Sequence, residues 1–389
     1  MNKQLMHTIE SLASLFEEAS IPYTFIEDAS LFLQGMDITP KEIKVLIQWD
    51  LFEKGYGLLE GAGRSAIVES AAAASFSCSY ENMPVTVSCM YNTTIKTDPY
   101  RIETKGVWCR SLYSYMYSGA GDDGTAIVDY LLNKQKELTE KNEQAWNQNN
   151  YAALINRFGE PGEIANKIMK NPEWRLYPFG KYMHGLKGKK VLHLLGSNGV
   201  KAAAMALMGA EVSVVDFSME NATYAKEVAA AANVEIDYIV SDVSSLQPAD
   251  LEGKFDYVLM ELGVLHYFIT LEPLFKLIKN ALADNGSYIL HEFHPISTKL
   301  ITSSGKKHKV TGNYFNPELT YQSVAFSKHM PDQVKEELAE TVQRKWTLGE
   351  IVTSAASAGL RITTLEEEPN HKMHDIGLPK TYTLVAAKQ

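Results

Sequence analysis

One stretch of this chain constrains its fold more than any other: an apolar run that ends in a glycine loop. Val191–Leu195 is followed by Gly196, Ser197, Asn198 and Gly199, then by an alanine-rich helical pattern, and then by a second apolar run that ends at Asp216. Glycines at the first turn let a ligand approach the backbone, and an acid after the second strand can accept hydrogen bonds from ribose hydroxyls. The stretch therefore predicts a site for a nucleotide-containing cofactor.

The same alternation of apolar runs and helical patterns continues toward the C-terminus. Such a rhythm is typical of stacked βαβ units and a parallel sheet. The expected fold is α/β: a seven-stranded, mostly parallel, Rossmann-like sheet with helices on both faces, preceded by a smaller α+β domain. The seven strands are expected at Val191–Leu195, Glu211–Val215, Ile236–Val240, Phe255–Met260, Ser287–Phe293, Arg361–Glu367 and Tyr382–Ala387.

With 389 residues, the chain is long for a single core, so two domains are expected. Residues 131–150 are rich in Lys, Glu, Gln and Asn and lack the apolar stripe of a buried helix. We therefore expect an α+β domain over residues 1–135, a helical connector over 136–158, and the cofactor-binding domain over 159–389.

Charge and cysteine content restrict the partners and the compartment. The 37 basic residues are outnumbered by 47 acidic ones, for a net charge of -10, which argues against nucleic acid as a partner. Three cysteines are too few for a disulfide framework. The first twenty or so residues form an amphipathic helical pattern with acids rather than a signal peptide, and no apolar run is long enough for a membrane span. We expect a cytoplasmic protein without a membrane partner.

Acidic residues follow three of the predicted strands directly. Asp216, Asp242 and Glu261 stand after the second, third and fourth strands. Ligands of open parallel sheets bind outside the carboxyl ends of the strands, so these three acids should line one crevice.

In these stretches the chain resembles the class I S-adenosylmethionine-dependent methyltransferases, over about residues 159–388. That family's first motif has an acid followed by glycines at alternate positions, which align with His193, Leu195, Ser197 and Gly199; only Gly199 matches. The resemblance implies S-adenosyl-L-methionine as the cofactor. It implies that Asp216 holds the ribose, that Asp242 and Val243 face the adenine with Phe217 packed on it, and that Glu261 and Leu262 approach the methionine, above a loop made by Gly196, Ser197 and Gly199.

Two histidines are candidates for proton transfer. His266 follows the fourth strand and His294 the fifth, and histidine titrates near neutrality. A structural role, such as a hydrogen bond to a carbonyl, is the alternative for each. A single His and Glu pair at 291–292 lacks the ligand count of a metal site, so no metal is expected.

The expected acceptor is a small molecule. The family's Asn-Pro-Pro-Tyr signature for amino groups on bases and proteins is absent, because residues 261–264 are Glu-Leu-Gly-Val. Aromatic residues flank the expected crevice, and the family often closes the segment before the first strand over the cofactor. Trp174 and Tyr177 are therefore lid candidates, with Tyr314 as a further substrate-site candidate. The alternative is a cofactor-sensing or scaffold protein that binds S-adenosylmethionine without transfer; a homodimer is compatible with either.

The N-terminal domain resembles a nucleotidyltransferase-like fold over Pro22–Asp50. In that family two acids, spaced by one residue, bind divalent metal, and they align here with Glu42 and Lys44. An ammonium at the second position would repel Mg²⁺. We therefore expect a domain without transfer activity, serving in substrate capture, dimerisation or regulation. A working nucleotidyltransferase would have to bypass Lys44.

Overall fold

The computed structural model of the protein describes residues 3–116, 123–304, 307–330, 338–370 and 377–388. The chain forms two compact units. The first comprises residues 1–130 with 315–317, and the second comprises residues 131–314 with 318–389. The division falls within helix α4 (Asp123–Trp146).

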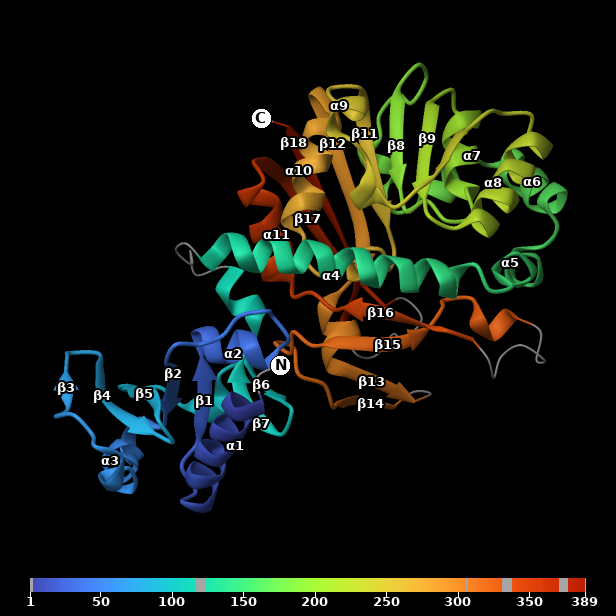
Figure 1. Ribbon diagram of the computed structural model, residues 1–389. Coiled ribbons are helices and arrows are strands. Elements are labelled where there is room, and N and C mark those ends of the chain that lie inside the picture. The colour runs from blue at the N-terminus through green and yellow to red at the C-terminus, as the bar shows by residue number, and fades with distance from the viewer. Residues whose placement is uncertain (1–2, 117–122, 305–306, 331–337, 371–376, 389) are drawn as a thin grey trace. The chain divides into compact units, whose positions relative to one another are not determined.

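The second unit contains a seven-stranded sheet in the order β10-β9-β8-β11-β12-β18-β17 (Figure 1). The first five strands in this order are parallel, and β18 runs antiparallel to both β12 and β17. This arrangement confirms the predicted Rossmann-like sheet. The strand bounds are β8 Lys190–Leu194, β9 Glu211–Asp216, β10 Asp237–Val240, β11 Phe255–Glu261, β12 Leu282–Phe293, β17 Leu360–Pro369 and β18 Pro379–Lys388.

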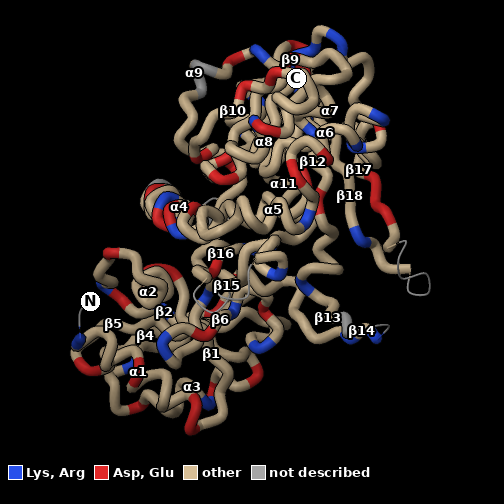
Figure 2. The backbone as a smooth tube through the Cα atoms, turned by 90° about the vertical axis from the view of Figure 1, so that its right-hand side faces the viewer, with Lys and Arg blue, Asp and Glu red and all other residues tan. Residues whose placement is uncertain are grey.

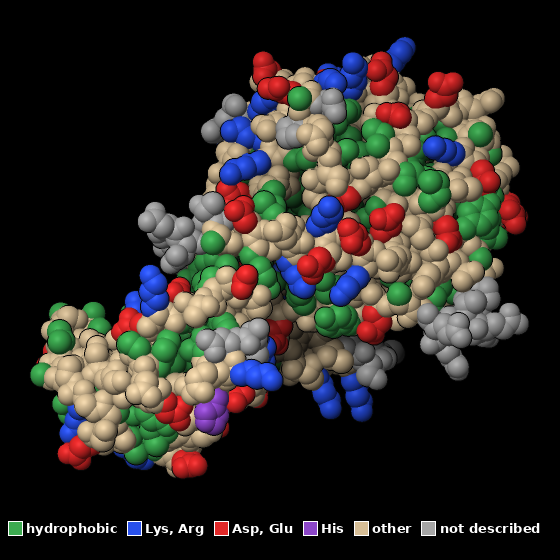
Figure 3. Space-filling view, in the orientation of Figure 1, with side chains coloured by type: hydrophobic (Ala, Val, Ile, Leu, Met, Phe, Trp, Pro, Cys, Tyr) green, Lys and Arg blue, Asp and Glu red, His purple; other side chains and the backbone are tan. Residues whose placement is uncertain are grey.

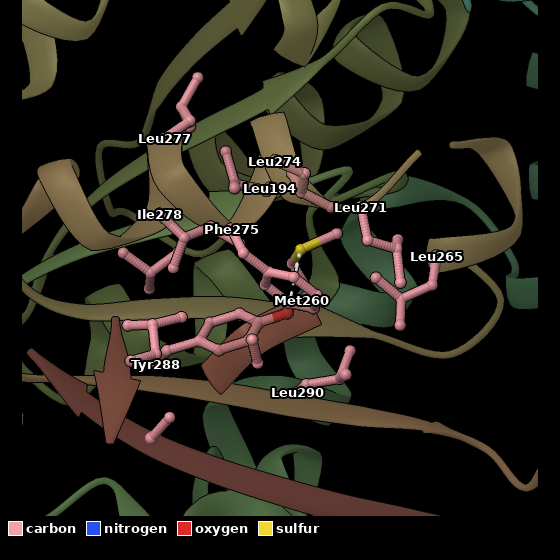
Figure 4. Packing of buried hydrophobic residues seen from close by; sticks show 14 of the residues in the cluster. Leu194, Met260, Leu265, Leu271, Leu274, Phe275, Leu277, Ile278, Tyr288 and Leu290 are labelled. Carbon is pink, nitrogen blue, oxygen red and sulfur yellow. Dashed lines mark hydrogen bonds between the residues drawn. The ribbon is translucent and has the colours of Figure 1, made fainter. Parts of the chain in front are cut away.

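Helices cover both faces of this sheet because its central strands are apolar on both sides. Ala202 and Met205 of α7 (Val200–Leu207) pack on one face, and Phe275 and Ile278 of α10 (Glu272–Ala281) pack on the other. Figure 4 shows the second of these cores, where the Tyr288 hydroxyl donates to the Met260 sulfur at 3.4 Å. Helix α8 (Met219–Ala231) packs beside α7, and α11 (Leu348–Ser357) beside α10.

The fifth strand starts earlier than expected. The strand was expected to begin at Ser287, whereas β12 begins at Leu282. Phe255 pairs with Leu282 and Tyr257 with Ser287, so residues 283–286 bulge out of the ladder. Asn285 has φ 64, a left-handed conformation that Asn tolerates, which explains why turn-forming residues stand inside a strand.

The residues expected as a connector, 136–158, form the end of α4 and helix α5 (Asn150–Phe158). Ala145, Trp146, Ala153 and Leu154 are buried within the second unit. Helix α6 (Pro161–Lys170) then leads toward β8. Two hairpins that the sequence analysis did not predict follow β12: β13 (Ile301–Ser304) with β14 (Lys307–Val310), and β15 (Leu319–Ser323) with β16 (Glu340–Arg344).

The first unit has its own seven-stranded mixed sheet, in the order β3-β4-β5-β2-β1-β7-β6. Its core joins apolar side chains of α1 to those of the strands, for example Phe16 with Phe25. The bounds are α1 Lys3–Glu18, β1 Tyr23–Ile26, α2 Glu27–Leu33, β2 Ile43–Ile47, α3 Phe52–Leu58, β3 Val68–Glu69, β4 Ala73–Tyr80, β5 Met83–Met90, β6 Arg101–Thr104 and β7 Val107–Arg110.

Glu42 and Lys44, which align with the metal-binding acids of nucleotidyltransferases, each contact another side chain. Lys44 forms an ion pair with Glu27 at 2.6 Å, and Glu42 accepts a hydrogen bond from the Thr86 hydroxyl. Across the described ranges, no group of three or more His, Cys, Asp or Glu side chains is placed to hold a metal ion.

Charges of both signs are interspersed over the backbone of both units (Figure 2). The face in Figure 3 likewise shows small groups of hydrophobic side chains between acidic and basic ones. In the part of the chain that the structure describes, no helix combines the length and the apolar character that a membrane crossing requires.

Gly199 is the glycine on which the loop after β8 depends most. It has φ +68, and a Cβ placed there would lie 2.4 Å from the Ala225 Cβ on α8. We predict that Gly199→Ala lowers the free energy of unfolding by about 2–4 kcal/mol, because left-handed strain and overpacking add. Denaturant unfolding followed by circular dichroism measures this.

Gly349→Ala is the matched control, since Gly349 lies in α11 with no atom within 4 Å of an added Cβ. This substitution should leave stability unchanged or raise it by up to about 1 kcal/mol. Equal midpoints for the Gly199→Ala variant and the wild type would contradict the packing described.

Candidate active site

A cavity of about 620 Å³ lies at the carboxyl ends of the parallel strands in the second unit. Its walls include the loop after β8, Asp216 at the end of β9, and the loop after β11. The strand order reverses between β8 and β11, so the segments after these two strands leave a crevice between them. The acids Asp216 and Glu261 both line it.

The loop after β8 keeps a tight shape although it lacks two of the expected glycines. Leu195 has φ 50 and Ser197 has φ 46, the left-handed region in which glycine is free of strain. Neighbouring strands hold the loop: the Leu195 amide donates to the Val215 carbonyl at 2.7 Å, and the Tyr238 hydroxyl donates to the Ser197 carbonyl at 2.7 Å. Tertiary hydrogen bonds thus offset the backbone strain.

Asp216 is a buried carboxylate that organises this loop. Its Oδ1 accepts from the Ser218 amide at 2.9 Å and the Asn221 side chain at 3.2 Å, and its Oδ2 accepts from the Ser197 amide at 3.1 Å. Burial raises its pKa, and these three donors act in the opposite direction. Each carboxylate oxygen accepts about two hydrogen bonds, so Oδ2 retains capacity for a ribose hydroxyl.

A second carboxylate, Glu292, fixes the loop after β11. Its Oε2 accepts from the amides of Val264 at 2.9 Å and Leu265 at 3.3 Å, and its Oε1 accepts from those of Gly263 and Phe293. Burial raises the pKa of Glu292, while the four amides lower it. The loop starts at Leu262, which has φ 46 and lines the cavity.

Asp242 and Val243 lie at a smaller hollow beside the cavity. Both hollows are lined by Leu195, Asp216, Phe217 and Tyr267. The Asp242 carboxylate caps the short helix at Val243–Ser245 by accepting from the Ser244 amide at 3.0 Å. Phe217 meets the Tyr267 ring edge to face, with centroids 6.5 Å apart. These residues form one continuous rim with the glycine loop.

Comparison with known proteins agrees with this geometry. Residues 193–290, which contain the glycine loop and the acids after the strands, match the family model described as a methyltransferase domain. The chain contains a methyltransferase domain. The segment matched excludes the first unit entirely.

One curated relative is the ubiquinone biosynthesis O-methyltransferase of Azotobacter vinelandii, which is 38% identical over 73 residues. The match covers 19% of this chain and 31% of that protein. Among solved structures, a putative S-adenosylmethionine-dependent methyltransferase from Listeria monocytogenes is 21% identical, over 56% of this chain and 98% of that one, with a TM-score of 0.43. A methyltransferase from Mesorhizobium loti is 19% identical, over 56% of this chain and 99% of that one, with a TM-score of 0.44.

The cofactor of this domain is S-adenosyl-L-methionine, and the cavity of the methyltransferase domain fits it. The cofactor carries no phosphate, and the loop before α7 presents no cluster of basic side chains among the described residues that line the cavity. Asp216 and Glu261 both present carboxylates to this cavity. Gly196, Ser197, Phe217 and Leu262 also line the cavity, whereas Gly199 supports the loop from behind.

The two histidine candidates separate in the structure. His266 lines the cavity, and burial, aided by the charge of Lys345, lowers its pKa to about 4. His294 is buried away from the cavity lining: its Nε2 lies 2.7 Å from Glu367 on β17, and its Nδ1 accepts from the Ile296 amide at 3.2 Å. His294 therefore lies outside the cavity lining, with Nδ1 engaged in the turn after β12 and Nε2 beside Glu367, and its catalytic role stays a prediction.

The aromatic candidates also separate. Trp174 and Tyr177 line the mouth of the cavity and are 65% and 68% exposed. Tyr314 does not line it; its hydroxyl accepts from the Leu348 amide at 3.1 Å and so supports the start of α11. Its role as a substrate-site residue stays a prediction.

Several residues that line the cavity were not predicted from the sequence. Trp146 stands at the end of a polar helix, and its Nε1 donates to the Tyr267 hydroxyl at 3.0 Å. Phe326 and Gln343 come from the segment around the β15–β16 hairpin, and Lys201 comes from the first turn of α7. The one sequence signal was a tryptophan in an otherwise polar helix. A large apolar side chain is unusual at an exposed helix position, so its presence indicates that it packs against another segment.

Three histidines with lowered pKa values make the stability of this unit dependent on pH. Burial lowers the pKa of His193 to about 3 and the pKa values of His266 and His291 to about 4. In the unfolded chain they titrate near 6.5, so the unfolded state binds protons first as the pH falls. Stability is complete above pH 6.5 and decreases toward pH 4, by up to about 2 kcal/mol per histidine at pH 5.

We predict that His266→Gln makes the pH dependence of the unfolding free energy between pH 7 and pH 5 less steep. Replacing the exposed His184 by Gln should leave the slope unchanged. The measurement is denaturant unfolding at closely spaced pH values. A His266→Gln slope as steep as that of the wild type would contradict a His266 that is neutral in the folded protein.

Proposed function

We propose that the protein transfers a methyl group from S-adenosylmethionine to a small, largely apolar molecule bound in this cavity. The observation that carries the proposal is a cavity with the Asp216 site at one side and aromatic walls at the other. A volume of about 620 Å³ falls within the range of about 300–1,000 Å³ of small-molecule sites. When bound, the cofactor supplies an electrophilic methyl carbon on its sulfonium.

Aromatic side chains support an acceptor with a flat or apolar body. Trp146, Phe158 and Phe326 form one wall, with ring centroids of Trp146 and Phe326 6.0 Å apart and those of Phe158 and Phe326 5.6 Å apart. Gln322, Ser323 and Gln343 add neutral polar groups from the β15–β16 hairpin. Neutral amides and a hydroxyl orient a ligand without requiring that it be charged. The O-methyltransferase relative is compatible with an oxygen atom as the nucleophile.

The chain's own contribution to the reaction is alignment. In-line displacement requires the nucleophile, the methyl carbon and the leaving sulfur to be held in one direction, and positioning alone supplies a large rate factor. Glu292 holds the loop after β11 through four backbone amides, so that Leu262 and His266 are fixed at the cavity. With a pKa of about 4, His266 stays neutral near pH 7 and is a weak base. We propose that it orients the acceptor by a hydrogen bond.

The exposed Trp174 and Tyr177 remain the proposed lid. Segments that close over a site exclude water and commit the substrate. The expected absence of a nucleic-acid partner, the cytoplasmic location and the homodimer stay predictions, as does the inactive nucleotidyltransferase-like character of the first unit.

The cofactor site is tested by calorimetric titration with S-adenosylmethionine and with its demethylated product, S-adenosylhomocysteine. We predict that Asp216→Asn weakens binding of both by about ten- to a hundredfold, because a charged hydrogen bond to the ribose is lost. Asp237→Asn, at the opposite end of the neighbouring strand β10, is the matched control and should bind as the wild type does. Unchanged affinity in the folded Asp216→Asn variant would contradict the assignment.

Transfer is tested with a methyl-labelled cofactor and a collection of small aromatic and apolar metabolites. Label in an acceptor, lost in Asp216→Asn, is the expected result. Tight cofactor binding without label in any acceptor would instead favour the cofactor-sensing alternative.

A further inference from the structure

Two buried asparagines connect Asp216 to the junction between α4 and α5. Asn221 lies in the first turn of α8 and lines the cavity, and its Nδ2 donates to Asp216 Oδ1 at 3.2 Å. Asn221 Oδ1 accepts from Nδ2 of Asn150, the first residue of α5, at 2.7 Å. Both asparagines are fully or almost fully buried, and Asn150 lies outside the cavity lining. We call the hydrogen-bonded series Asn150, Asn221 and Asp216 the amide relay.

The carboxylate at one end fixes the direction of both amides. An ionised carboxylate can only accept hydrogen bonds, so Asn221 must present its NH₂ group to Asp216 and its carbonyl oxygen to Asn150. Asn150 must then present its own NH₂ group to Asn221. The donor that reaches Asp216 is therefore held in its orientation by a residue that makes no hydrogen bond to Asp216.

A purely structural role does not account for Asn150. Its Oδ1 is buried and has no hydrogen-bond partner in the part of the chain that the structure describes. Leaving a buried polar atom without a partner costs about 1–3 kcal/mol. A leucine of similar size would avoid this cost, but it could not donate to Asn221.

Further hydrogen bonds hold the junction against α8. The Oγ of Ser218, which caps α8, lies 2.9 Å from Asn147 Oδ1 and 3.3 Å from the Trp146 carbonyl oxygen. The Tyr151 amide donates to the Glu220 carboxylate at 2.6 Å. The backbone is thus anchored on both sides of the first residue of α5, which keeps that residue's side chain directed at Asn221.

We propose that Asn150 and Asn221 are positioning residues of the cofactor site, which orient the Asp216 carboxylate so that Oδ2 faces the ribose hydroxyls. The inference rests on the proposed binding of the ribose by Asp216. It adds to that proposal a residue of the α4–α5 junction, Asn150, which acts without touching the cofactor.

Two ligands that differ only at the ribose test this role. S-adenosylhomocysteine carries both ribose hydroxyls, and its 2′,3′-dideoxy analogue lacks them. In calorimetric titrations, the wild type should bind the analogue at least about tenfold more weakly, as expected for lost hydrogen bonds to a charged group. Asn150→Leu and Asn221→Leu should each weaken binding of S-adenosylhomocysteine by about tenfold and binding of the analogue by less than about threefold, because only the contribution of the hydroxyls is lost.

Asn156→Leu is the matched control. Asn156 lies on the same helix, is exposed, and donates from Nδ2 to the His329 carbonyl at 2.9 Å, outside the cavity lining. This variant should bind both ligands as the wild type does. Circular dichroism establishes that each variant is folded, and a leucine variant that does not fold is replaced by alanine at the same position, which also removes the donor.

Equal weakening for both ligands in the Asn150 and Asn221 variants would overturn the amide relay, since it would show that the asparagines only maintain the fold. Unchanged binding of S-adenosylhomocysteine in the folded variants would overturn it too. A wild-type protein that binds S-adenosylhomocysteine and the analogue equally would contradict the assignment of the ribose to Asp216. A wild type that binds neither ligand would overturn the proposed function, and the relay with it.

Discussion

The pairing of β8 with β11 is the constraint on which the site depends. Because β9 lies on the other side of β8 and β12 on the other side of β11, the chain leaves these two central strands in opposite directions. The glycine loop and the loop at Leu262–Leu265 therefore flank one crevice. The register of this pair, Leu259 with His193, also sets Glu261 beside His193 and within reach of Lys201.

Several ionisable groups around this crevice are shielded from water, and the surrounding structure determines whether each is charged. Asp216 and Glu292 are buried carboxylates that accept mostly from main-chain amides, and each fixes one of the two loops. A buried charge is costly unless it is hydrogen-bonded, so the loops and their carboxylates require each other. His193 and His266 stay neutral near pH 7 and fill space without adding charge.

Sequence alone predicts the sheet and half of the site. The strands of the second unit are apolar runs separated by helical patterns, and acids at their carboxyl ends converge whatever the details of packing, which placed Asp216 and Glu261 correctly at the cavity. His294 follows the same rule of position, yet it pairs with Glu367, and only the sheet order brings β17 near β12. Such pairing between distant segments leaves no local pattern.

The remaining residues of the site could not be predicted for a related reason. Trp146 and the β15–β16 hairpin come from segments without a strong period, and tertiary packing alone turns them toward the cavity. Glu292 lies at a buried position of β12 and accepts hydrogen bonds from backbone amides. The sequence does not show which backbone amides will surround a buried acid, so its role could not be predicted.

A crystal structure with S-adenosylhomocysteine tests the central claim most directly. The account predicts ribose hydroxyls within hydrogen-bond distance of the Asp216 carboxylate and the adenine beside Phe217 and Asp242. A nucleoside bound outside this crevice would contradict it.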